Sequence, residues 1–167
     1  YTTLFRSVET PQKLSISDTD TFVLDVTVSS FGDAIYPAAS MSIAFDASRL
    51  EFLGIEEGNV FIKSDNTSGQ TLPEWSYNTA ACNESGRINV MYLDMTGGKN
   101  AFSKDLLHED NNVVLRLKFR LRGSARAGDV CDLTVEDAVF AASDETQSLA
   151  MTTNTLTVKN GKLVIGE

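Results

Sequence analysis

The chain has 167 residues, of which 42% are hydrophobic and 22% charged, and its formal net charge is −9 at pH 7. This length suits a single domain over residues 1–167 with a substantial hydrophobic core. The acidic balance argues against binding to nucleic acid or to an anionic membrane, because no basic stripe is present to replace phosphate counterions. No apolar run approaches the roughly 18 residues that a membrane-spanning helix requires.

The first half of the chain predicts four strands, at residues 4–8, 22–28, 38–45 and 50–56. Each shows alternation of apolar and polar residues or β-branched composition, and polar turns separate them. In the third strand Met41, Ile43 and Phe45 form the core face. The opposite face carries only small side chains, at Ala38, Ser40, Ser42 and Ala44. Such a flat face is suited to close approach by another surface.

The second half predicts strands at residues 75–80, 87–94, 113–122 and 133–142, the last interrupted near Glu136-Asp137, and one helical turn at 102–107. Two short apolar segments, 156–158 and 163–165, close the chain as a bent strand or a hairpin. The Asn160-Gly161 pair between them favours the hairpin. About nine short strands with almost no helix predict an all-β fold, an antiparallel β-sandwich.

Four segments of the sequence carry a resemblance to a known family. They read, in chain order, ASMSIAFDASRLEFLGIEEGNVF, GRINVMYLD, VVLRLKFRLRGSARAG and DAVFAASDE. In this order and spacing they resemble strands of the cohesin family, over about Leu4 to Ile165. The loops at 62–73 and 97–112 are longer than in the commonest cohesins. Ala38 and Ser40 stand where many members have polar contact residues.

The resemblance implies a nine-stranded jelly-roll sandwich and a non-catalytic role. A cohesin of a scaffoldin binds a calcium-loaded dockerin module, in a 1:1 complex, and so assembles or anchors a secreted cellulosome that degrades plant polysaccharides. The chain lacks the Asp-x-Asp-x-Asp-Gly loop with a distal Glu that a calcium-binding EF-hand requires. The resemblance therefore places it on the receptor side. A carbohydrate-binding module and a cell-surface adhesin remain the alternatives.

Catalytic and metal sites have little support in the sequence. The only histidine, His108, lies in a polar stretch, and no nucleophile, base and orienting group occur at a recognisable spacing. The acidic pairs are typical of solvated turns: Asp18/Asp20, Asp129/Asp132, Glu136/Asp137 and Asp144/Glu145. We therefore expect no enzymatic activity, no metal site and no cofactor. Cys82 and Cys131 match no zinc or redox motif, and we expect them to be unbridged.

Trp75 and Tyr77 keep the carbohydrate-binding alternative open. Two aromatic residues at alternate positions of a strand share a face, and exposed rings of this kind stack on sugars. The other interpretation is that they pack beneath the long loop. The chain has no second tryptophan to extend a sugar platform, which favours a protein partner.

The strand at 87–94 predicts the binding surface. If Ile88, Val90 and Tyr92 form its core face, then Met91 and Leu93 point outwards beside Arg87 and Asn89. An apolar pair on a wet face marks an interaction site, unless a long loop covers it. The cohesin resemblance puts this strand in one sheet with those at 38–45, 75–80 and 133–142. The predicted partner-binding set is Ala38, Ser40, Ser42, Ala44, Trp75, Tyr77, Arg87, Asn89, Met91, Leu93, Val139, Ala141 and Ser143.

Overall fold

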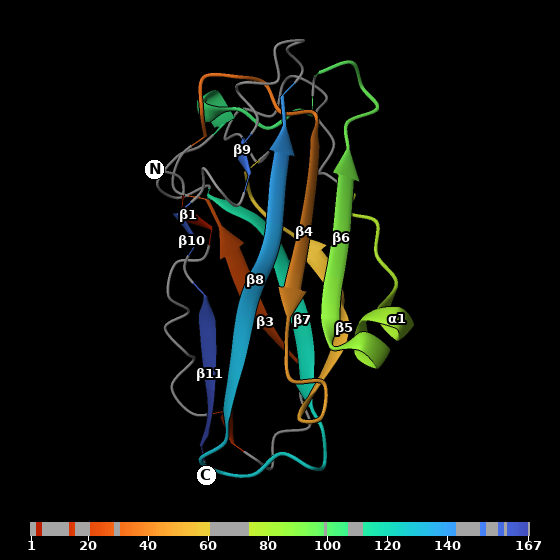
Figure 1. Ribbon diagram of the computed structural model, residues 1–167, viewed down its shortest axis with the longest axis vertical. Coiled ribbons are helices and arrows are strands. Elements are labelled where there is room, and N and C mark those ends of the chain that lie inside the picture. Colours follow the sequence, from red (N-terminus) through yellow and green to blue (C-terminus); the bar gives the residue numbers. More distant parts are fainter. Residues whose placement is uncertain are drawn as a thin grey trace.

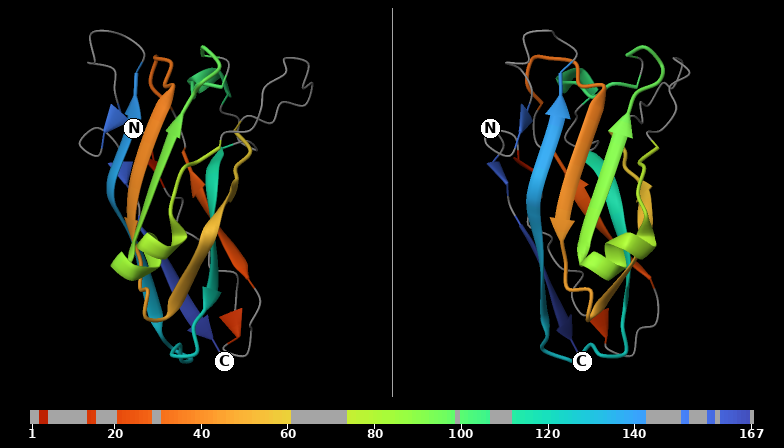
Figure 2. Two further views of the ribbon diagram at one scale, coloured as in Figure 1. Left: turned by 90° about the vertical axis from the view of Figure 1, so that its right-hand side faces the viewer. Right: turned by 45° about the vertical axis from the view of Figure 1, so that its right-hand side comes forward.

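The computed structural model describes residues 3–4, 14–15, 21–28, 31–60, 74–98, 100–106, 112–142, 151–152, 157–158 and 160–166. Two β-sheets pack face to face (Figures 1 and 2). The larger sheet has the order β2 (Leu14–Ser15), β11 (Gly161–Gly166), β8 (Val130–Ala141), β4 (Ala38–Ala44) and β6 (Arg87–Leu93), and β9 (Met151–Thr152) pairs with β8. The smaller sheet has the order β3 (Phe22–Thr27), β7 (Val113–Leu121) and β5 (Leu50–Glu57).

The predicted antiparallel β-sandwich is confirmed, with differences in its strands. Within the described residues, seven strands have six or more residues and four have only two, whereas the sequence predicts nine. The long strands pair antiparallel, and the parallel pairs are β1 (Thr3–Leu4) with β10 (Thr157–Val158) and β2 with β11. The helices are α1 (Thr79–Ser85) and a 3₁₀ turn at Lys104–Leu106, inside the predicted helical turn. In the described part of the chain no helix has the length and apolar character needed to cross a bilayer.

The core lies between the two sheets and consists of the residues that the alternation predicts. Met41, Ile43 and Phe45 of the third predicted strand are buried, as are Ile88, Val90 and Tyr92. Aromatic rings fill both ends of the core. Phe45, Phe52 and Phe119 pack together at one end, and Phe31, Tyr36, Phe102 and Phe140 at the other. The predicted interruption of the strand at 133–142 is a β-bulge, because Ser42 pairs with Asp137 while Ile43 pairs with Val135.

The strand predicted at residues 75–80 is wrong beyond its first half. Ser76 alone pairs with β6, through an isolated bridge to Met91, and α1 begins at Thr79. The Asn78 side chain caps this helix, its Oδ1 accepting a hydrogen bond from the Ala81 N–H at 3.0 Å. Gly86, with φ 68°, ends it in the left-handed conformation.

The predicted C-terminal hairpin is also wrong. β10 pairs with β1, whereas β11 runs antiparallel to β8, so the two segments belong to different sheets. Asn160 lies between them and its Oδ1 accepts a hydrogen bond from the Val135 N–H at 3.0 Å. This bond fixes Asn160 to β8. The Asn160-Gly161 pair therefore connects strands of two different sheets and does not form the turn of a hairpin.

Candidate functional site

Strands β8, β4 and β6 lie side by side in the larger sheet (Figure 1). Their pairing brings most of the predicted partner-binding residues together on the outer face. The pairing register arranges them in rows across the three strands. Two rows are apolar or small: Leu93/Ala38/Ala141 and Met91/Ser40/Val139. The next two are polar or charged: Asn89/Ser42/Asp137 and Arg87/Ala44/Thr134. The outer face of these three strands therefore changes from apolar to polar along the strand direction, and we call it the graded face.

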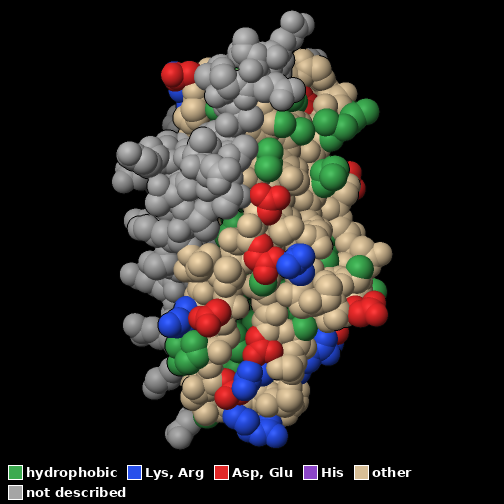
Figure 3. All heavy atoms as spheres, in the orientation of Figure 1, with side chains coloured by type: hydrophobic (Ala, Val, Ile, Leu, Met, Phe, Trp, Pro, Cys, Tyr) green, Lys and Arg blue, Asp and Glu red, His purple; other side chains and the backbone are tan. Residues whose placement is uncertain are grey.

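Its apolar half is exposed to water. Met91 and Leu93 are 61% and 58% exposed, which agrees with the predicted direction of their side chains. The residues opposite them on β4 are Ser40 and Ala38, which are too small to cover them. Figure 3 shows hydrophobic side chains gathered over the C-terminal end of β6 and the loop that follows. Large apolar side chains clustered at one place on a surface are typical of an interaction site.

The polar half is organised by two contacts between strands. The Ser42 hydroxyl donates a hydrogen bond to Asn89 Oδ1 at 2.5 Å. Arg87 forms an ion pair with Glu136 on β8, with 2.5 Å between Nη2 and Oε2. Arg87 lies opposite Ala44 of β4, and the small alanine leaves room for the arginine to reach the far strand. Both partners are more than a third exposed, so this pair orders the surface and contributes little to stability.

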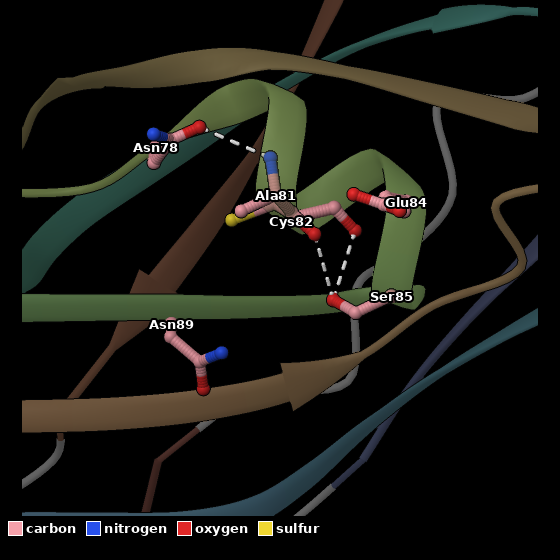
Figure 4. A pocket seen from close by; sticks show the side chains of 6 residues that line it. All are labelled: Asn78, Ala81, Cys82, Glu84, Ser85 and Asn89. Carbon is pink, nitrogen blue, oxygen red and sulfur yellow. Dashed lines mark hydrogen bonds between the residues drawn. The ribbon is translucent and has the colours of Figure 1, made fainter.

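Two shallow hollows meet at Asn89. One, of about 530 Å³, is lined by Ser40, Met41, Ser42, Ser76, Tyr77, Asn89, Val90, Met91 and Asp137. The other, of about 420 Å³, lies beside α1 and is lined by Asn78, Ala81, Cys82, Glu84, Ser85 and Asn89 (Figure 4). Figure 4 shows Asn89 extending from β6 toward β4, with the residues of α1 on the other side of β6. The surface is thus hollowed and not flat where its polar half meets the edge of the sheet.

The aromatic pair does not share a face, which corrects one part of the predicted set. Trp75 is only 6% exposed and packs against Tyr92 and Phe102, with ring centroids 5.6 and 6.1 Å apart. It is therefore a core residue and not a surface contact. Tyr77 is 40% exposed and its ring makes a T-shaped contact with that of Phe52, with ring centroids 5.9 Å apart. Residues two apart share a face only in a regular strand, and Ser76 is the single paired residue of this segment.

Ser143 is the one member of the predicted partner-binding set that lies outside the described residues. His108 and the acidic pairs Asp18/Asp20 and Asp144/Glu145, for which the sequence predicts no site, lie outside them as well. In the part of the chain that the structure describes, no group of three or more His, Cys, Asp or Glu side chains could hold a metal ion.

The two cysteines are buried free thiols, Cys82 on α1 and Cys131 at the start of β8. Burial raises the pKa of Cys131 to about 11, so its thiol stays protonated and unreactive at neutral pH.

Comparisons with known proteins point to one family. The family model described as Cohesin domain matches residues 12–159. No curated protein sequence matches the chain. Among solved structures, the sixth cohesin of scaffoldin B from Acetivibrio cellulolyticus, in complex with a Cel5 dockerin mutant, is 17% identical with a TM-score of 0.63, over 98% of this chain and 96% of that one.

Two further solved structures are similar. A cohesin of Clostridium thermocellum, in the Coh-OlpA-Doc918 complex, is 17% identical with a TM-score of 0.63, over 92% of this chain and 94% of that one. The seventh ScaB type I cohesin from Pseudobacteroides cellulosolvens is 16% identical with a TM-score of 0.62, over 99% and 90%. At these identities the likeness shows a shared fold.

Proposed function

The chain belongs to the cohesin family, and we propose that it is a non-catalytic module that binds a dockerin module through the graded face of β8, β4 and β6. In this role it serves extracellular assembly of a cellulosome, as one single-domain part of a larger scaffold. The observation that carries the proposal is the exposure of Met91 and Leu93, side by side on β6, among small residues of β4. The partner is a calcium-loaded dockerin in a 1:1 complex.

The graded face has the parts that a protein interface needs. Met91 and Leu93 supply apolar anchors, and burying a side chain of this size releases about 1.5–3 kcal/mol. The half-buried small residues Ser40 and Ala38 let a partner approach the sheet closely. Arg87 and Asn89 continue the same face as a polar rim, where hydrogen bonds add specificity more than affinity.

The carbohydrate-binding alternative loses its main support. A sugar platform needs aromatic rings that face solvent together, and Trp75 is buried in the core beside Tyr92. Tyr77 alone is partly exposed, at the edge of the first hollow. The large apolar side chains that the face does expose, Met91 and Leu93, carry no aromatic ring, which suits a protein surface better than a sugar ring.

Single substitutions of the two anchors test the proposal. The chain is titrated by calorimetry with a panel of recombinant calcium-loaded dockerins, and the tightest of these becomes the probe dockerin. Met91→Asp or Leu93→Asp is expected to abolish binding, since loss of one central anchor costs about 2 kcal/mol or more, near thirtyfold in affinity. A buried carboxylate adds a desolvation penalty to that loss.

The matched control is Val23→Asp, which places the same charge at a partly exposed position of β3 in the opposite sheet. This variant should bind the probe dockerin as the wild type does. Circular dichroism and melting temperature should be unchanged in all three variants. Wild-type affinity in folded Met91→Asp and Leu93→Asp proteins, or no binding to any dockerin of the panel, would contradict the proposal.

A further inference from the structure

We propose that residues 75–77, which we call the clasp, hold the docking anchor Met91 in position from the open edge of its sheet, and that Tyr77 is the positioning residue on which this depends. The clasp acts through the backbone of β6 and not through a contact of the Tyr77 side chain with the dockerin. This inference rests on the proposed function and explains how its anchor is kept in place.

β6 is the edge strand of the larger sheet, and the clasp bonds this edge at Met91. Residues of an antiparallel strand direct their N–H and C=O groups alternately to its two sides. Met91 directs both groups away from β4, because its N–H donates to the Ser76 carbonyl at 3.0 Å and its carbonyl accepts from the Ser76 N–H at 2.7 Å. The main-chain hydrogen bonds of the clasp therefore fall on the docking anchor itself.

The Met91 side chain receives little support from its own sheet. It is mostly exposed, and the residue opposite it on β4 is the small Ser40. A side chain with so little packing around it takes its position from the backbone that carries it. The hydrogen bonds to Ser76, together with the pairing of β6 with β4, therefore fix where the anchor lies.

The two neighbours of Ser76 fasten the clasp to the core and to the opposite sheet. Trp75 is buried, with its ring centroid 5.6 Å from that of Tyr92. The Tyr77 ring rests on Phe52 of β5, which is buried as well. Figure 2 shows the segment that leads into α1 running between β6 and β5. Ser76 is therefore held on both sides along the chain.

β5 is shaped to receive the Tyr77 ring. The pairing of β5 with β7 is irregular between Phe52 and Gly54, and Gly54 has a φ of 146°, which residues with a side chain rarely adopt. A Cβ on Gly54 would lie 2.8 Å from the Tyr77 hydroxyl oxygen and 3.5 Å from the ring. The missing side chain at Gly54 therefore leaves the space that Tyr77 occupies.

A fixed anchor favours binding. The edge of a sheet opens more readily than its centre, because fewer contacts hold it. If β6 were loose at Met91, binding of the dockerin would have to order this segment first, and affinity would fall by that cost. The clasp orders Met91 in the free module, before the partner arrives.

Hydrogen exchange of single amides, followed by NMR in the free module, tests the positioning role directly. Tyr77→Ser removes the ring that rests on Phe52, and we expect the Met91 N–H to exchange about tenfold faster. The Val90 and Tyr92 amides, which point to β4, should keep their wild-type rates, whereas a general loss of stability would speed all three. Tyr77→Phe keeps the ring contact and should restore the wild-type rate at Met91.

Affinity for the probe dockerin, measured by surface plasmon resonance, tests whether this position serves docking. Tyr77→Ser should weaken binding about threefold to tenfold, the cost of ordering a short segment again, and Tyr77→Phe should bind as the wild type does. Gly54→Ala should also weaken binding and speed exchange at Met91, because its Cβ displaces the ring. The matched control is Val23→Ser on β3, whose side chain is as exposed as that of Tyr77; it should change neither quantity.

Each other combination of results contradicts the positioning role. Weaker binding of Tyr77→Ser with an unchanged exchange rate at Met91 would mean that Tyr77 contacts the dockerin itself. Faster exchange with unchanged affinity would mean that the clasp orders β6 without serving docking, and no change in either would mean that the ring holds nothing. In all three cases Met91→Asp still abolishes binding. Wild-type affinity of folded Met91→Asp would instead refute the docking surface of the proposed function.

Discussion

Gly58 lies directly after β5, where the backbone passes very close to the backbone of β7. A Cβ at this position would lie 2.1 Å from the Val113 carbonyl oxygen and 2.5 Å from that of Val114. The next residue is fixed to the same strand, since the Asn59 N–H donates to the Val113 carbonyl at 2.8 Å and Asn59 Oδ1 accepts from the Val113 N–H at 2.8 Å. Only a residue without a side chain fits between β5 and β7 here.

Gly58→Ala is therefore expected to lower the free energy of unfolding by about 2–3 kcal/mol, because the clash is with backbone that cannot move aside. Urea denaturation followed by circular dichroism measures this change. Gly123→Ala is the matched control: no atom lies within 4 Å of its added Cβ, so its stability should equal or exceed the wild type. Two variants of equal stability would show that β5 and β7 can separate without cost.

Residue-level prediction from the sequence succeeded on the regular strands β4 and β6. Parity alone placed Met91 and Leu93 outside and Val90 inside, because the period of a strand is two. It failed at Trp75, where only one neighbouring residue is paired and the backbone leaves the sheet. The requirement for glycine at position 58 has a tertiary cause, because the carbonyl groups that exclude a side chain there belong to Val113 and Val114.

At the scale of elements, the Asn83 side chain joins α1 to β5, and Cys82 of the same helix is buried in the core. Asn83 Oδ1 accepts a hydrogen bond from the Phe52 N–H at 2.8 Å, and Asn83 Nδ2 donates to the Phe52 carbonyl at 2.8 Å. The amide thus replaces a missing strand neighbour beside β5, next to the irregular pairing between Phe52 and Gly54. A third bond, from Nδ2 to the Thr79 carbonyl at 2.9 Å, fixes the side chain to its own helix.

Asn83→Ala is expected to cost about 2–3 kcal/mol of stability, since it leaves the polar groups of Phe52 without this partner. Thermal unfolding measures the loss. Glu84→Ala changes the neighbouring, exposed residue of the same helix and should have little effect. Comparable melting temperatures of the two variants would mean that α1 is not held by this amide.

The sequence did not predict α1 because seven residues, Thr79 to Ser85, contain no apolar period. The signals that could have found it were the two ends: Asn78 as an N-cap and Gly86 as a left-handed C-cap. At α1 a local signal was missed, whereas at Asn160-Gly161 a local signal was misleading. The pair is a strong hairpin signal locally, but the pairing of β11 with β8 and of β10 with β1 overrides it.

At the scale of the whole molecule, ion pairs order the end of the sandwich that holds the turn between β4 and β5, which we call the closed end. Arg49, in the turn between β4 and β5, contacts Asp46 at 2.5 Å and Asp129 at 2.8 Å. Asp129 belongs to the connection between β7 and β8, so one guanidinium joins the chain segments that pass between the two sheets. Ion pairs of a single arginine therefore hold together the connections at this end of the sandwich.

These carboxylates make the closed end sensitive to acid. A hydrogen bond from Ser48, and then Arg49, hold the pKa of Asp46 below its ordinary value, and the Arg126 N–H followed by Arg49 does the same for Asp129. In the unfolded chain the pKa of both carboxyl groups returns to about 3.9. Between the folded and unfolded pKa values of these carboxyl groups the unfolded state therefore binds more protons. The stabilisation is complete above about pH 5 and is lost as pH falls through the lower, folded values.

Arg49→Met removes the shared partner of both carboxylates. We expect this variant to be less stable than the wild type at pH 7, and the difference in melting temperature to shrink as pH falls from 5 to 2, because protonation removes the same attraction from the wild type. The matched control is Lys162→Met, which loses the same charge from exposed β11 and should follow the wild-type profile. Scanning calorimetry at several pH values measures the three profiles. Parallel curves for Arg49→Met and the wild type would show that Arg49 does not set the acid response of this end.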